Sequence, residues 1–144
     1  EVGFSLMETD EMNFSILRSA TNALKSGGKF IFTTLNGLYP LFHSLAEFHN
    51  KAQREGDTVE VFKELTFDFM TLRDYNTLEV EDDLGNKKEL KCNERYYMPS
   101  EITWLLKSLT MKNIDIFGAK LGAYSRSDAL TIEDFEMLVI AKKE

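Results

Sequence analysis

One stretch indicates the fold of this chain: Leu24-Lys25-Ser26-Gly27-Gly28-Lys29-Phe30-Ile31-Phe32-Thr33-Thr34-Leu35-Asn36-Gly37. Lys25 is placed in the last turn of a helix, where a cation suits the negative end of the helix dipole. Gly27 or Gly28 can close that helix in the left-handed conformation. The run from Lys29 to Leu35 is typical of a strand buried on both faces, as in a parallel sheet. Asn36-Gly37 ends this strand, at the end that faces the ligand crevice in open α/β sheets.

Composition indicates a globular protein of one domain. The chain has 144 residues, of which 43% are hydrophobic and 12% aromatic, and this length is enough to bury a core. No apolar run approaches the roughly 20 residues that span a bilayer, so we expect a soluble, cytoplasmic protein without a membrane partner. The net charge of -7 disfavours nucleic-acid binding, which needs a basic face. The one cysteine, Cys92, excludes an internal disulfide framework.

Helical spacing is found on both sides of the quoted strand. Acidic residues load the first turn of a helix that we expect from about Thr9 or Asp10 to Lys25. A second helix is predicted from Leu38 to Gln53, where apolar residues recur three or four apart. His43 and His49 on this helix lie six residues apart and face different sides, so we expect surface positions rather than metal ligation.

Between residues 59 and 97 the pattern becomes that of strands. Strands are predicted at 59–62, 65–69, 75–81 and 88–95, and the turn 82–86 joins the last two as a hairpin. The alternation is imperfect from Thr71 to Tyr75, which predicts a bulge or break there. The segment therefore has the pattern of an antiparallel insertion.

The last third of the chain returns to alternating helix and strand. Met98-Pro99 begins a helix whose apolar stripe leaves Trp104 on another side, where we expect it to cover a neighbouring loop. A strand is predicted at 113–119 and a polar loop at 122–134. The final strand, 135–141, is almost wholly apolar and is therefore expected at the centre of its sheet.

The order of these motifs resembles the carboxyl-terminal half of a class I S-adenosylmethionine-dependent methyltransferase, along essentially the whole chain. The stretch Leu24 to Gly28 is similar to the family's turn before its fifth strand, with Ser26 in place of the usual proline. The stretch from Arg95 to Leu106 is similar to the family's R-x-Y, S/P-E-L and L-L motifs. Leu138 to Lys143 is similar to its seventh strand, which runs antiparallel between the fifth and sixth.

The resemblance implies an α/β fold: half of a Rossmann-like mixed sheet with an antiparallel last strand, plus the antiparallel insertion at about 59–97. Residues 1–144 would form a single partial domain. The family's glycine-rich cofactor motif would precede Glu1, and this chain contains no glycine-rich phosphate loop or other common catalytic motif. The chain is therefore expected to bind S-adenosylmethionine weakly or not at all and to be inactive alone.

The resemblance also implies the positions of a site, with no metal and no assigned base. Phe4 and Ser5 would lie on the cofactor side, and the acceptor side would hold six residues: Asn36, Gly37, Tyr39, Arg73, Arg95 and Tyr97. For Asn36-Gly37 a sharp turn is an equal alternative. Arg95 could bind an anionic acceptor or form a salt bridge with an acidic residue. Tyr96 and Tyr97 face opposite sides of a strand, so one is expected in the core. Arg126 is a further candidate.

Two functions remain open on the sequence alone. The first is a methyltransferase that acts on a small-molecule acceptor. The alternative is a non-catalytic α/β binding or assembly module, which would not bind S-adenosylmethionine. In the first case the strand Lys29–Leu35 loses its neighbour on one side, and an open strand edge favours pairing with another copy. We therefore also expect a homo-oligomer formed through this edge.

Overall fold

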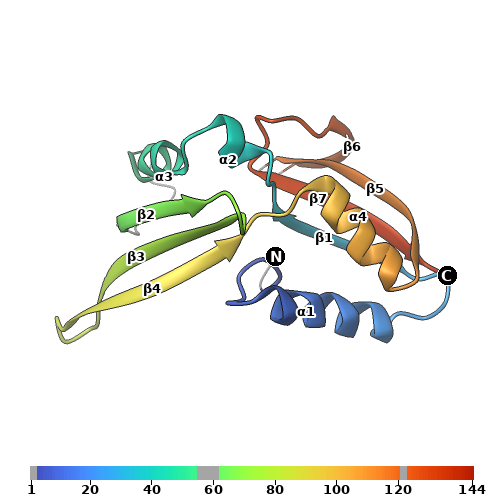
Figure 1. Cartoon of the computed structure of the whole chain (residues 1–144), viewed down its shortest axis with the longest axis horizontal. Helices are drawn as coiled ribbons and strands as arrows, with labels where there is room; N and C mark the ends of the chain where they lie inside the picture. The colour runs from blue at the N-terminus through green and yellow to red at the C-terminus, as the bar shows by residue number, and fades with distance from the viewer. Residues whose placement is uncertain (1–2, 55–61, 121–122) are drawn as a thin grey trace.

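The computed structural model describes residues 3–54, 62–120 and 123–144. Its strands form two antiparallel sheets, a large one in the order β1-β7-β5-β6 and a small one in the order β2-β3-β4. The small sheet projects from the body that the large sheet forms with α1 and α4 (Figure 1). The elements are α1 (Asp10–Ala23), β1 (Lys29–Leu35), α2 (Tyr39–Phe42), α3 (Leu45–Arg54), β2 (Phe62–Asp68), β3 (Arg73–Glu81), β4 (Lys87–Arg95), α4 (Pro99–Ser108), β5 (Met111–Lys120), β6 (Ala123–Ala129) and β7 (Glu136–Lys143).

The first helix forms as expected but ends earlier. The Thr9 side chain caps α1 by accepting a hydrogen bond from the Met12 N–H at 3.2 Å. The helix ends at Ala23, because Leu24 takes an extended conformation. The placement of Lys25 in the last helical turn is therefore wrong. Gly27 does adopt a positive φ of 76°, in a separate turn where the Gly28 N–H donates to the Lys25 carbonyl at 2.9 Å.

The last strand occupies the centre of the large sheet. β7 lies between β1 and β5 and is antiparallel to both, which confirms the expected central position. Its residues Met137, Val139 and Ala141 join the main core with apolar side chains of α1 and α4. These two helices therefore cover the same face of the large sheet.

The quoted strand is less buried than its sequence indicates. Thr33, Thr34 and Leu35 are buried, but Ile31 is 58% exposed. In the described part of the chain, β1 pairs only with β7, and antiparallel. The expectation of burial on both faces in a parallel sheet is therefore wrong for the first half of β1, where Ile31 is largely exposed and no described strand pairs with the other edge.

The insertion folds as a three-stranded meander. β3 and β4 pair from Arg73↔Arg95 to Glu81↔Lys87, which confirms the hairpin with its turn at 82–86. The expected break before Tyr75 is the β2–β3 turn, where Leu72 has a φ of 51°. The predicted strand 59–62 lies outside the described residues except for Phe62.

Three local predictions are wrong. The helix predicted from Leu38 to Gln53 is two helices, because His43 is extended and the Ser44 hydroxyl accepts the Glu47 N–H at 3.3 Å, which starts α3. The predicted loop at 122–134 contains β6, a mostly exposed edge strand with few apolar residues to mark it. Trp104 is 72% exposed, so most of its side chain faces solvent instead of covering a loop of the described residues.

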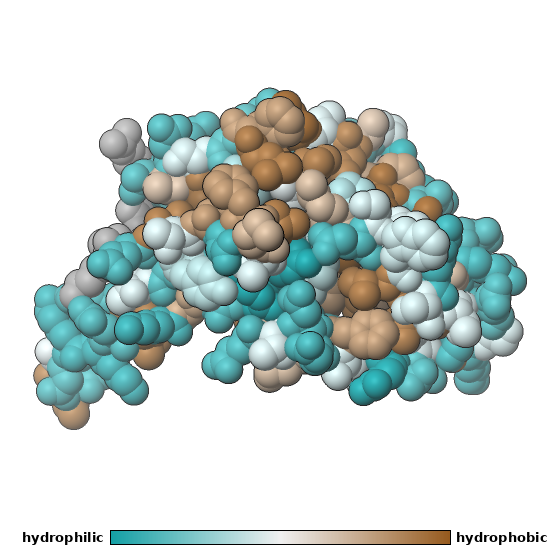
Figure 2. Space-filling model, in the orientation of Figure 1, coloured by the Kyte–Doolittle hydropathy of each residue, from teal (hydrophilic) through white to brown (hydrophobic). Residues whose placement is uncertain are grey.

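The surface carries an apolar patch over α2 (Figure 2), where Leu41 is 43% and Phe42 is 62% exposed. Within the residues that the structure describes, no helix is long and apolar enough to cross a membrane.

Candidate functional site

A hollow of about 280 Å³ opens at the carboxyl end of β1, and we call it the β1 crevice. Five parts of the chain meet there: the loop 3–7, β1, α3, the end of β4 and the start of β7. This is the end of the strand at which the sequence predicts a ligand crevice. The lining residues are Phe4, Ser5, Leu6, Thr33, Thr34, Leu35, His49, Glu94, Phe135 and Glu136.

The loop 3–7 is held firmly against β1 and β4. Phe4 stacks on Tyr97 with ring centroids 4.9 Å apart and meets Phe32 edge-on at 5.6 Å. The Ser5 hydroxyl is hydrogen-bonded to the Thr34 hydroxyl, and the Ser5 carbonyl accepts the Arg95 N–H at 2.7 Å. Ser5 has a φ of 76°, a conformation that is strained for a residue other than glycine. The surrounding contacts therefore stabilise a strained backbone beside the crevice.

Two buried arginines join the insertion to this loop and to α1. Arg73 on β3 donates to the Met7 carbonyl at 2.8 Å and forms an ion pair with Asp10 at 2.7 Å. Arg95, which is opposite Arg73 in the β3–β4 register, also contacts Asp10, at 3.2 Å. Asp10 lies in the first turn of α1, so a single carboxylate bridges the helix and both arginines.

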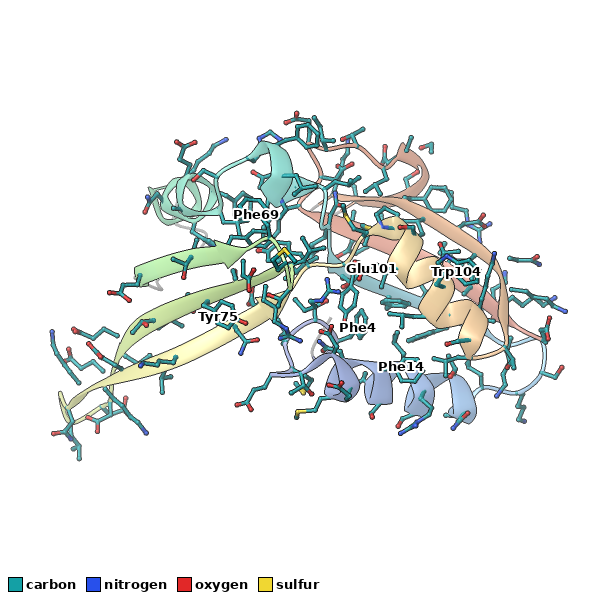
Figure 3. All side chains as sticks on the ribbon, in the orientation of Figure 1. Phe4, Phe14, Phe69, Tyr75, Glu101 and Trp104 are labelled. Atoms are coloured by element: carbon teal, nitrogen blue, oxygen red, sulfur yellow. The ribbon has the colours of Figure 1, made fainter. Side chains whose placement is uncertain are left out.

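Arg95 makes further contacts toward α4. It pairs with Glu101 at 2.6 Å, and Glu101 also accepts the Met98 N–H at 2.9 Å. Its guanidinium lies over the Tyr97 ring at 4.4 Å and donates to the Tyr96 carbonyl. Of the two alternatives for Arg95, the structure therefore contains the salt bridge. Figure 3 shows Glu101 in the first turn of α4 and Trp104 farther along the same helix.

The two neighbouring tyrosines enter different cores. Tyr97 packs in the main cluster with Phe4, whereas Tyr96 packs with Leu35 and Leu45 in a second cluster. Their side chains face opposite sides as predicted, but both are buried: Tyr96 is 0% exposed and Tyr97 is 3% exposed. Burial, and next the nearby Asp10 carboxylate, raises the pKa of Tyr97 to about 12. This phenol therefore stays protonated near neutral pH and is unsuited to act as a base.

Asp74 is a buried carboxyl group that the sequence did not single out. It is 0% exposed on β3, accepts the Glu94 N–H at 3.0 Å and faces the Tyr96 hydroxyl at 3.5 Å. Burial raises the pKa of Asp74 to about 6, against the lowering effect of these hydrogen bonds. Nothing in the pattern of β3 distinguishes it from an exposed strand residue.

Asn36 and Gly37 make backbone contacts of the kind expected of a tight turn. The Asn36 amide donates to the Asp134 carbonyl at 2.7 Å, and its oxygen accepts the Leu38 N–H at 3.1 Å. The Gly37 N–H donates to the Tyr97 carbonyl at 2.9 Å, and a β-carbon on Gly37 would lie 3.0 Å from the Tyr97 backbone. Neither residue lines the β1 crevice.

Tyr39 belongs to an aromatic cluster above the crevice. It stacks on His43 at 4.5 Å and meets Phe48 and Phe135 edge-on at 5.5 and 5.4 Å. Burial, and next Glu133, raises the pKa of Tyr39. Phe135 stacks in turn on Phe48 at 4.1 Å, so Tyr39 is joined to the crevice lining through this ring.

His49 is the main residue that sequence reasoning missed. It was expected on the surface, but it is half-buried and lines the β1 crevice with Glu94 and Glu136. No signal in the sequence placed these three side chains together, since they come from α3, β4 and β7. Among the described residues no group of histidine, cysteine and acidic side chains could hold a metal ion.

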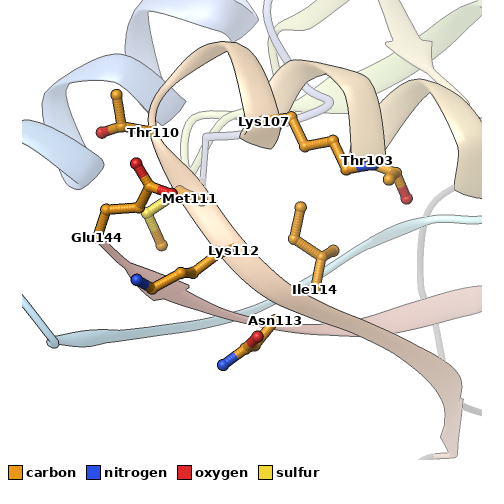
Figure 4. Close-up of a pocket in the computed structure, with 8 residues that line it drawn as sticks. All are labelled: Thr103, Lys107, Thr110, Met111, Lys112, Asn113, Ile114 and Glu144. Carbon is orange, nitrogen blue, oxygen red and sulfur yellow. The ribbon is translucent and has the colours of Figure 1, made fainter.

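Other hollows lie outside the crevice. One of about 470 Å³ between α1 and α4 is lined by Asp10, Arg95, Tyr97, Ser100, Glu101, Trp104, Leu105 and Ser108. A second, of about 480 Å³, lies at the far end of α4 and includes Lys107 and Lys112 (Figure 4). Arg126 lines a third with Lys29 and Asp115. The predicted site residues thus fall into three groups. Phe4 and Ser5 line the crevice, and Arg95 and Tyr97 line the α1–α4 hollow. The other four are not among the described lining residues of either: Asn36, Gly37, Tyr39 and Arg73.

No protein-family model and no curated protein sequence matches this chain. Among solved structures, the CcbJ methyltransferase from Streptomyces caelestis is similar with a TM-score of 0.64 at 12% identity, over 98% of this chain and 57% of that one. An S-adenosylmethionine-dependent methyltransferase from Clostridium acetobutylicum is similar with a TM-score of 0.61 at 18% identity, over 97% of this chain and 54% of that one. The chain spans little more than half the length of either, and its fold is similar to that part of these methyltransferases.

Proposed function

We propose that this chain is the carboxyl-terminal part of an S-adenosylmethionine-dependent methyltransferase that acts on a small-molecule acceptor. The observation that carries the proposal is the shared fold, which extends over 98% and 97% of this chain but only 57% and 54% of the two methyltransferases. In this proposal the four-stranded sheet is half of a Rossmann-like sheet, and β1 is the strand that borders the missing half.

The residues of the β1 crevice fit one part of the cofactor. Phe4, Leu35 and Phe135 offer an apolar lining, and the hydroxyls of Ser5 and Thr34 add polar groups. No lysine, arginine or glycine is among the described residues that line it, so this part of the lining offers no fixed cation for the carboxylate of S-adenosylmethionine. We therefore assign to this chain the methyl-bearing side of the cofactor, which when bound supplies an electrophilic methyl group.

The residues of the chain would act by position and by exclusion of water. In a displacement reaction much of the rate enhancement comes from holding the reacting groups in line. The strained Ser5 backbone, fixed by Thr34 and Arg95, is rigid support for such a site. The aromatic rings of Phe4 and Phe135 exclude water from it. Arg73 and Arg95 stabilise this arrangement through Asp10 rather than by direct contact with an acceptor.

Calorimetric titration with S-adenosylmethionine tests the proposal. The longer protein of which we propose this chain to be a part is expected to bind S-adenosylmethionine. The 144-residue chain alone is expected to show no detectable binding. A Ser5→Gly variant keeps the positive φ at no steric cost but removes the crevice hydroxyl, so it should bind more weakly. Ser127→Gly, which removes an exposed hydroxyl on β6, is the matched control. If the longer protein does not bind S-adenosylmethionine, the non-catalytic binding or assembly module is favoured instead.

The open edge of β1 gives a second readout for the isolated chain. Ile31 is 58% exposed next to a strand edge without a partner among the described residues, and such edges pair with other chains. The 144-residue chain is expected to self-associate through β1, and Ile31→Lys should reduce this association. A monodisperse monomer at high concentration, measured by light scattering, would argue against the proposed missing neighbour.

A further inference from the structure

The α1–α4 hollow is a second cavity large enough for a ligand, and the proposed function assigns it no role. Its volume of about 470 Å³ lies within the range of small-molecule sites. Its lining comes from α1, from the end of β4 and the residues that follow it, and from α4. Figure 2 shows apolar side chains in the recess between the two helices. Parts of the chain that are far apart in sequence therefore converge on one hollow, which is the usual composition of a binding site.

The charges around this hollow balance one another. Arg95 donates to Asp10 Oδ1 at 3.2 Å and to Glu101 Oε2 at 2.6 Å. Arg73, which is not among the described lining residues, donates to the same Asp10 oxygen at 2.7 Å. Two carboxylates and two guanidinium groups together carry no net charge. A neutral ligand is therefore favoured here, because an ion would have to be desolvated without an opposite charge to compensate it.

One hydrogen-bond acceptor in this network remains open. Both arginines donate to Oδ1 of Asp10, and the other carboxylate oxygen, Oδ2, accepts no hydrogen bond from the residues that the structure describes. The Asp10 side chain is 56% exposed, whereas the Arg95 side chain is 8% exposed and already donates to Asp10, Glu101 and the Tyr96 carbonyl. The hollow therefore offers a ligand a carboxylate acceptor rather than a guanidinium donor, which suits a ligand with an O–H or N–H group.

An exposed indole supplies the apolar contact. Trp104 is 72% exposed, and tryptophan is enriched at the centres of recognition sites. Lys107 Nζ lies 5.5 Å from the centroid of the Trp104 ring but is not among the described lining residues, so the hollow meets another part of the indole. The Tyr97 ring already contacts Phe4 and Arg95. The main ring surface left for a ligand is that of Trp104, and a flat indole favours a flat aromatic partner.

We propose that the α1–α4 hollow binds a small, neutral aromatic molecule that carries a hydroxyl or N–H donor. The ring packs on Trp104 and Leu105, and the donor group forms a hydrogen bond with Oδ2 of Asp10. This site is separate from the β1 crevice, since the two share no described lining residue. It goes beyond the proposed function and does not depend on S-adenosylmethionine.

Three probes separate the ring from the donor: phenol has both, anisole has the ring without the donor, and cyclohexanol has the donor without a flat ring. Each is titrated at pH 7 into the 144-residue chain, and NMR follows the indole N–H of Trp104, the one tryptophan of the sequence. Phenol should shift this signal saturably and bind about tenfold more tightly than anisole, as a hydrogen bond to a charged acceptor provides. Cyclohexanol should bind more weakly than phenol.

Two results would overturn the proposal. One is binding of anisole or cyclohexanol that is as tight as that of phenol. The other is saturation with phenol that leaves the Trp104 signal unshifted. The dispersion of the amide signals in the same spectra shows whether the chain is folded. If it is not, the longer protein is titrated in the same way, with Trp104→Phe to identify the indole signal, and the same two results decide.

Variants locate the two contacts. Asp10→Asn should remove most of the phenol advantage over anisole, and this ratio within one variant is insensitive to a general loss of stability. Asp83→Asn removes the same charge at the exposed β3–β4 turn and should leave the ratio unchanged. Trp104→Leu should weaken phenol and anisole alike, measured by calorimetry. A ratio that Asp10→Asn leaves intact, or aromatic binding that Trp104→Leu leaves intact, would contradict the assignment.

Discussion

The two ends of the β3–β4 hairpin carry similar charged residues in different environments. At the inner end, Arg73 and Arg95 face one another in register and are 6% and 7% exposed. At the outer end, Lys87 forms a 2.9 Å ion pair with Glu79, but the Lys87 side chain is 62% exposed. An ion pair therefore contributes to stability at the inner end of the hairpin and contributes little at the outer end, because solvent screens the outer pair.

The largest expected effect is at the inner end. Arg95→Met leaves the Glu101 carboxylate without its guanidinium partner, leaves Asp10 with Arg73 alone, and removes the stacking on Tyr97. Because this change removes charged hydrogen bonds to Glu101 and to the buried Tyr96 carbonyl, we expect the free energy of unfolding to fall by about 3 kcal/mol. Urea denaturation measures it, with Arg95→Lys as the control that retains charge but loses the fork geometry. A loss smaller than that of the outer pair would show that burial does not decide how much each ion pair contributes to stability.

An intermediate effect is expected at Asp74, which lies beside the inner arginines in β3. Burial raises its folded-state pKa to about 6 from 3.8. Between these values the folded protein binds more protons than the unfolded one, so stability falls as pH rises from about 4 to about 6, by about 2 kcal/mol. Asp74→Asn should remove this part of the pH dependence. The free energy of unfolding of the variant, relative to that of the unmutated protein, should therefore be higher at pH 7 than at pH 4.5. Denaturation at pH 4.5 and pH 7 of both proteins measures it, and an unchanged difference between the two pH values would show that another group is responsible.

The smallest expected effect is at the outer end. Lys87→Met removes the Glu79 ion pair and should change the free energy of unfolding by no more than about 0.5 kcal/mol, less still at high salt. The same urea measurement applies at low and high ionic strength. A loss equal to that of Arg95→Met would mean that burial is not what separates the two ends.

The elements that were predicted well are those with strong local signals. Thr9 and the acidic residues after it marked the start of α1, and Met98-Pro99 marked that of α4. The apolar run of β7 indicated its central position. β6 was missed because an exposed edge strand has no apolar alternation, and the α2–α3 break was missed because a change of backbone direction at His43 leaves the helical spacing intact.

The candidate site was harder to predict than the fold. Phe4 and Ser5, which the resemblance assigns to the cofactor side, line the β1 crevice, and their role in cofactor binding stays a prediction. His49, Glu94 and Glu136 were not predicted to line it, because a spacing rule applies within one element and these residues belong to three. The salt bridge of Arg95 was one of two alternatives, and only the position of Glu101 on the folded α4 decided between them.

Most of the helices and strands, the hairpin with its turn at 82–86 and the strand that ends at a crevice could be predicted from the sequence, since each depends on residues close in the chain. The tertiary structure alone decided which charged side chains are buried, which face of β1 is open, and which titratable groups meet at the end of Lys29–Leu35. Those properties depend on the distance between side chains that are tens of residues apart, and local periodicity contains no information on that distance.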